Sequence, residues 1–146
     1  MKIVKIMSAP RLSGILLSGV LLSGTAFAHG DYDRGQRVEI ASPQNYAVVS
    51  SPVPVNFKAY GVKIAPAGVD KHNAGHFHLA IDQVIDPPID EPMQPSAQHL
   101  LFTAGEMDTV LALTPGRHIL QLVVADEEHA PFENLVSPII TIEVKP

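Results

Sequence analysis

The sequence predicts an all-β fold, an antiparallel β-sandwich of about seven strands. Short segments alternate apolar and polar residues at period two, which is the period of a half-buried strand. Turn signals separate these segments, and the 146 residues include 13 prolines and 10 glycines. No window after residue 28 shows the 3.6-residue period of an amphipathic helix.

Residues 1–28 have the three parts of a cleavable secretory signal peptide. A basic start precedes an uncharged apolar run at 14–24, and small residues precede a cut after Ala28. The run is shorter than the roughly 20 apolar residues that span a membrane, which favours cleavage over a retained anchor. We therefore expect a periplasmic protein without an integral membrane segment. Residues 29–36 would be a flexible N-terminal segment and 37–146 the domain.

Most of the expected strands carry an apolar residue at every second position. They cover residues 37–40, 53–59, 76–82, 107–113, 117–125 and 139–145. The strand at 117–125 is apolar on both sides, as a central strand should be. In 76–82 the apolar side chains would face the core, while His76 and His78 would share the opposite, polar face. A tight turn is expected at Pro115-Gly116, because proline presets φ and glycine accepts positive φ.

Composition excludes several classes of function. The chain has no cysteine, which excludes disulfides, thiolate zinc sites and cysteine nucleophiles. Its formal net charge is −5, and removing the leader takes away three of the ten basic residues and none of the acidic ones, leaving −8. This acidity argues against a nucleic-acid partner. No recognised catalytic motif occurs, so we do not expect an enzyme.

His76 and His78 form the sharpest local feature. Side chains at i and i+2 of a strand point the same way, with Cα atoms roughly 6.6–7 Å apart. Two imidazoles so placed can converge on one zinc or copper ion. We expect His118 and His129 to close such a metal site, with Asp126 as a further ligand or as an acceptor that orients an imidazole. His99, expected in a loop, is a secondary candidate.

His29 offers a second possibility for copper. If the leader is cut after Ala28, the free amine and Nδ1 of His29 can chelate copper together. In the simpler interpretation, His29 is merely the residue that follows the cut. A simpler interpretation also exists for the other histidines, which the sequence equally allows to be surface or structural side chains.

Three motifs resemble one bacterial family. G-H-x-H-L-x-I-D at 75–82, P-G-x-H-x-L-Q-L at 115–122 and D-x-x-H-x-P at 126–131 are similar to an uncharacterised periplasmic family, the domain of unknown function numbered forty-three ninety-nine. Segments 42–62 and 113–126 resemble strands of bacterial immunoglobulin-like domains, which implies an immunoglobulin-like sandwich. The family pattern matches at His76, His78, Asp82, His99, His118, Asp126 and His129.

Two functions follow as hypotheses. The first is a periplasmic protein that binds copper or zinc through histidines as a carrier, buffer or accessory. The alternative is a metal-independent module that binds an envelope protein or a glycan through loops 63–75 and 86–95. Convergence of three histidine side chains on one point would favour the first.

Overall fold

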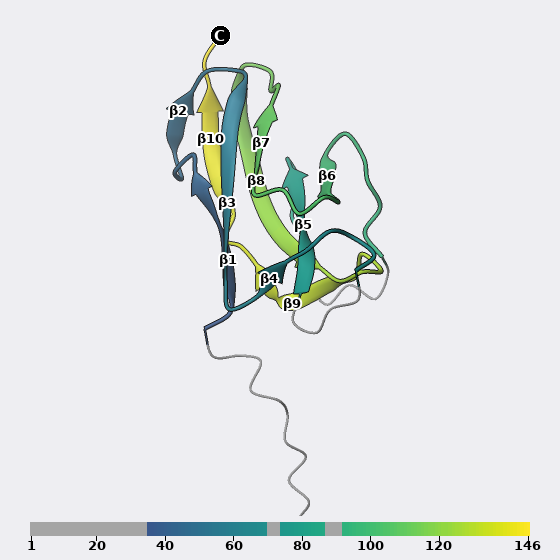
Figure 1. Cartoon of the computed structure of the whole chain (residues 1–146). Coiled ribbons are helices and arrows are strands. Elements are labelled where there is room, and N and C mark those ends of the chain that lie inside the picture. The colour runs from purple at the N-terminus through teal and green to yellow at the C-terminus, as the bar shows by residue number, and fades with distance from the viewer. Residues whose placement is uncertain (1–34, 70–73, 87–91) are drawn as a thin grey trace, which may run out of the picture.

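A computed structural model describes residues 35–69, 74–86 and 92–146 of the chain, and in them ten strands form two facing sheets (Figure 1). The expected β-sandwich is therefore confirmed. No helix occurs in these ranges, so none of them offers an apolar helix that could cross a membrane. The predicted leader, its cleavage after Ala28 and His29 lie outside the described residues.

The smaller sheet has the strand order β1–β3–β7. Its strands are β1 (Arg37–Ser42), β3 (Val53–Tyr60) and β7 (Asp108–Leu111). Both pairings are antiparallel. In β3, buried and exposed side chains alternate from Val53 to Lys58, which confirms the period-two pattern of its sequence.

The larger sheet has the order β2–β10–β8–β5–β4, with β6 also beside β5 and β9 beside β8. Its strands are β2 (Ala47–Val49), β4 (Lys63–Ile64), β5 (Ala74–Ile81), β6 (His99–Phe102), β8 (Gly116–Ala125), β9 (Pro131–Val136) and β10 (Ile140–Val144). Strand β8 is central, as its apolar sequence predicted. It pairs with β10 along its first half and with β9 along its second half.

The structure corrects the expected topology in two respects. Four short strands, β2, β4, β6 and β9, were not predicted, because none of them shows a long alternating pattern. Two of them pair in parallel, β2 with β10 and β4 with β5, so the sandwich is not wholly antiparallel. Both parallel pairs are only two or three residues long, and they extend the sheet at its margins.

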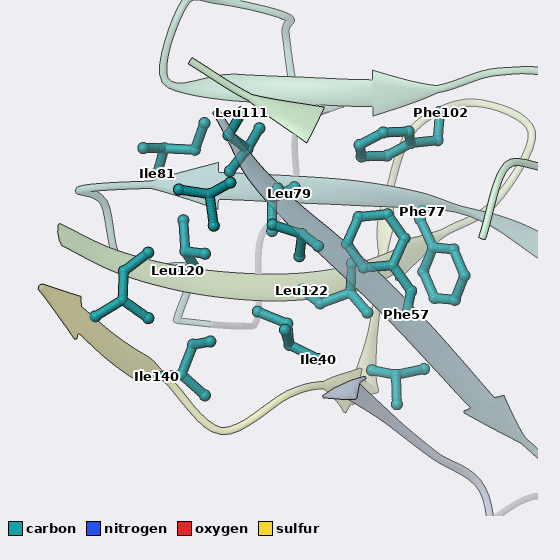
Figure 2. Close-up of a cluster of buried hydrophobic side chains, with 14 of the residues drawn as sticks. Ile40, Phe57, Phe77, Leu79, Ile81, Phe102, Leu111, Leu120, Leu122 and Ile140 are labelled. Atoms are coloured by element: carbon teal, nitrogen blue, oxygen red, sulfur yellow. The ribbon is translucent and has the colours of Figure 1, made fainter. Parts of the chain in front are cut away.

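The main core lies between the two sheets. Figure 2 shows β3 crossing the strands of the larger sheet obliquely, with Ile40 and Phe57 meeting side chains such as Leu79 and Leu122. The centroid of the Phe57 ring lies 5.3 Å from that of Phe77 and 5.0 Å from that of Phe102, in the tilted and edge-on arrangements that aromatic pairs prefer. This packing fixes which face of β5 turns inward.

The outer face of the larger sheet is buried as well. All eight residues of β5 are buried, including those on the side away from the main core. A second apolar layer covers this side and consists of Ala80, Ile85, Met93, Val123 and Ala125, with Val136 packed against it. The polar outer face expected for His76 and His78 is therefore wrong, and the two imidazoles lie in the interior.

Candidate metal centre

His76 and His78 extend from β5 into the second apolar layer. Alternate positions of the strand place both imidazoles on the same side, and they are 1% and 0% exposed. The antiparallel register sets His76 opposite Ala125 and His78 opposite Val123 on β8. Small and apolar neighbours therefore leave room for the rings and exclude water around them. Their interpretation as surface side chains is ruled out by this burial.

His129 reaches the same place from the turn between β8 and β9. Its backbone has φ = 67°, a left-handed conformation that is uncommon outside glycine. The N–H of His129 donates to the carbonyl of Asp126 at 3.1 Å, and the N–H of Met93 donates to the carbonyl of His129 at 3.0 Å. The turn is thus tied both to its own first residue and to the segment that covers the sheet.

Asp126 holds this turn with its side chain. Its Oδ1 accepts the backbone N–H groups of Glu128 and Ala130, both at 2.9 Å. Its carboxylate does not belong to the cluster of ligand atoms that the structure brings together in the described residues. Asp126 therefore positions His129 by capping the turn, the supporting role that the sequence allowed beside direct ligation.

Three ring nitrogens converge. Nε2 of His76 lies 2.8 Å from Nε2 of His78 and 2.9 Å from Nδ1 of His129, and the third side of the triangle measures 3.4 Å. A circle through the three nitrogens has a radius of about 1.8 Å, so a point about 1 Å above their plane lies about 2.0–2.1 Å from each, the bond length of zinc to imidazole nitrogen. The triangle fits one face of a metal's coordination sphere.

Hydrogen bonding alone does not satisfy this triangle. A ring nitrogen of a neutral imidazole carries either one proton or one lone pair. Among three nitrogens in mutual contact, at least one pair must therefore consist of two N–H groups or two lone pairs, and such a pair cannot form a hydrogen bond. A cation that accepts all three lone pairs removes this conflict.

His99 supports the centre from the edge. It begins β6, is 9% exposed, and places Nε2 3.1 Å from Nδ1 of His78. If His78 were to hold a metal through Nε2, its Nδ1 would carry the proton and could donate to Nε2 of His99. Ligating histidines are commonly fixed by such a second hydrogen bond. The predicted loop position of His99 is wrong, because the residue begins β6 and lies beside His78.

Burial favours the neutral forms of His76, His78 and His99. Burial and the neighbouring imidazoles lower the pKa of His78 to about 3. Burial and the nearby His129 lower the pKa of His76, against the opposing effect of Asp126. Burial also lowers the pKa of His99. Neutral imidazole is the form that ligates metals, so the lone pairs of His76 and His78 are available at neutral pH.

His118 does not join the cluster. It lies seven positions before Ala125 on β8, roughly 23 Å along the strand from the residue opposite His76. Its Nδ1 lies 2.8 Å from Asp82 Oδ2, and its Nε2 lies 2.9 Å from the carbonyl of Thr114. Both ring nitrogens are thus occupied. The expectation that His118 closes the site with His76 and His78 does not agree with this position.

A comparison with protein-family models agrees with the family resemblance seen in the sequence motifs. The family model described as Domain of unknown function (DUF4399) matches residues 55–145. The chain belongs to this family. The DUF4399 match includes all the histidines of the centre, and it excludes β1 and β2. No curated protein and no solved structure matches the chain.

Proposed function

We propose that this DUF4399 protein is an exported metal-binding protein that holds copper or zinc through His76, His78 and His129. One observation carries the proposal, the convergence of three ring nitrogens from β5 and the β8–β9 turn on one point. The apolar layer around them and the lowered pKa values of His76 and His78 support it. The leader expected at residues 1–28 supports a periplasmic location.

The proposed role is that of a carrier or buffer. Two ligands are fully buried, whereas His129 is partly exposed, so an ion can enter from the side of the turn. The sequence carries no catalytic motif, which favours binding over chemistry. The depth of the site favours retention of the ion.

Thermal unfolding with and without added metal tests the proposal. A ligand that binds the native state at about 100 times its Kd adds about 2.7 kcal/mol of stability. We expect a rise in Tm on the order of 10 °C with Cu(I), Cu(II) or Zn(II). The double variant His76→Ala, His78→Ala should lose the rise, because it removes two of the three ligands.

His118→Ala is the matched control, since it removes an imidazole on the same sheet that lies outside the cluster. It should change the Tm of the metal-free protein but keep the rise on adding metal. If neither metal shifts the Tm of the wild type at concentrations well above micromolar, the histidines are structural. The metal-independent envelope module is then the better hypothesis.

A further inference from the structure

We infer that the ion is copper in the Cu(I) state and that the thioether of Met93 is its fourth ligand. This inference rests on the proposed metal-binding function and goes beyond it by naming the ion and a ligand that is neither a histidine nor an acid. Three features lead to it: the position of Met93, the charge of the ligand set and the chemical softness of its atoms.

Met93 lies directly against the turn that carries His129. Its backbone N–H donates to the carbonyl of His129 at 3.0 Å, and its side chain is only 7% exposed. Its side chain belongs to the same apolar layer as Val123 and Ala125, the residues opposite His78 and His76. A methionine side chain is long, unbranched and adaptable, and its backbone is held against the turn that carries His129.

The charge of the ligand set favours a monovalent ion. Three imidazole ligands contribute no negative charge, and no carboxylate joins the converging ligand atoms in the described residues. The cost of transferring an ion from water into an apolar interior rises steeply with its charge. A buried ligand set without negative charge therefore favours an ion of single charge over a divalent one.

The softness of the ligands gives the same preference. Thioether sulfur is a soft ligand that selects Cu(I), and imidazole suits copper as well as zinc. Zinc in proteins takes nitrogen, thiolate and carboxylate ligands, and this chain has no cysteine. A set of three imidazoles and one thioether therefore suits Cu(I) better than Zn(II).

Competition with chromogenic chelators tests this inference. The affinities for Cu(I), under anaerobic reducing conditions, and for Zn(II) are measured for the wild type and for Met93→Leu, which has a similar volume. We expect Met93→Leu to weaken Cu(I) binding roughly tenfold or more and Zn(II) binding less than about threefold. Met107→Leu is the control, because Met107 lies beside β3 in the other sheet, and it should change neither affinity.

X-ray absorption of the Cu(I)-loaded wild type gives a readout that needs no variant. We expect a sulfur neighbour in addition to nitrogen neighbours. Bound Cu(I) with nitrogen neighbours alone, or an equal loss of both affinities in Met93→Leu, would overturn the inference and leave the proposed metal binding intact. If the wild type binds neither ion, the proposed function fails together with it.

Discussion

Nε2 of His76 and Nε2 of His78 lie 2.8 Å apart, although the two residues belong to one strand and neither imidazole is exposed. Side chains two positions apart on a strand normally lie parallel, with Cα atoms roughly 6.6–7 Å apart. Here the rings tilt together until their nitrogens touch, with ring centres 4.7 Å apart. The partner that brings a third nitrogen to this pair is His129.

His78 and His99 should differ in how much they contribute to metal affinity. His78→Ala removes a ligand, and we expect it to abolish tight binding. His99→Ala removes only the acceptor behind His78 Nδ1, which should weaken metal affinity by about 10–100-fold. Isothermal titration of both variants measures the difference. A His99→Ala protein that binds as weakly as His78→Ala would make His99 a ligand, as the sequence allowed.

Two substitutions can distinguish capping of the turn by Asp126 from direct ligation of a metal by its carboxylate. Asp126→Asn keeps an oxygen that can accept the N–H groups of Glu128 and Ala130, whereas Asp126→Ala keeps none. We expect Asp126→Ala to weaken metal binding about tenfold or more by releasing the turn, and Asp126→Asn to have a smaller effect. Equal losses in the two variants would contradict the capping role and indicate that the carboxylate itself is a ligand.

The pH dependence of stability should reveal the His118–Asp82 pair. Burial opposes the charge on His118, but hydrogen bonds to Asp82 and Thr114 and the negative charges of Asp82 and Glu143 raise its pKa above the usual value. Its stabilising contribution is therefore full below about pH 6.5 and is lost as the pH rises through its folded-state pKa.

The measurement compares the Tm values of the metal-free wild type and of His118→Gln between about pH 5.5 and about pH 8.5. The stability advantage of the wild type should be larger at about pH 5.5 than at about pH 8.5. Three other buried histidines also make stability depend on pH, because their lowered pKa values cost stability as the pH falls below about 6.5. These residues, His76, His78 and His99, are the same in both proteins. The difference between the two proteins therefore reports His118 alone. An advantage that grows with pH would contradict the pair.

Gly75 should tolerate no side chain. A Cβ added there would lie 2.5 Å from the carbonyl oxygen of Ala125 and 2.5 Å from Cγ1 of Val124. We expect Gly75→Ala to lower the free energy of unfolding by about 1–3 kcal/mol and to disturb the neighbouring His76. Chemical denaturation gives the first value and metal titration the second. A variant as stable as the wild type would show that β5 and β8 can separate without cost.

The predicted export has its own test. Mass spectrometry of the protein recovered from the periplasm of an expressing cell should give an N-terminus at His29. An intact Met1, or a different first residue, would remove the proposed copper chelation by His29. It would leave the centre built on β5 unaffected.

The sequence predicted the strands whose alternation is regular, such as β3, and it placed Phe77, Leu79 and Ile81 correctly on one face of β5. It could not predict that the opposite face is covered too. The cover comes from Ile85 and Met93, which lie outside the strands and show no periodic pattern. For the same reason, the burial of His76 and His78 was not foreseen.

The candidate site was predicted for the residues that are adjacent in sequence and only partly for the others. His76 and His78 are brought together by strand geometry, which a sequence reveals. His129 and His118 stand at opposite ends of β8, and only the direction and register of that strand decide which one meets β5. Strand register depends on long-range packing, which one sequence does not specify.

Strand β9 pairs with β8 through a register irregularity between Val123 and Ala125, at the margin of the sheet. The turn that carries His129 therefore belongs to a strand pair with an interrupted register, whereas His76 and His78 lie on a strand that pairs continuously with β8. Local opening of this hairpin would withdraw one ligand while the other two stay fixed. The lifetime of a bound ion would then be set by the opening rate of the hairpin, and the ion could be passed on while the sandwich remains folded.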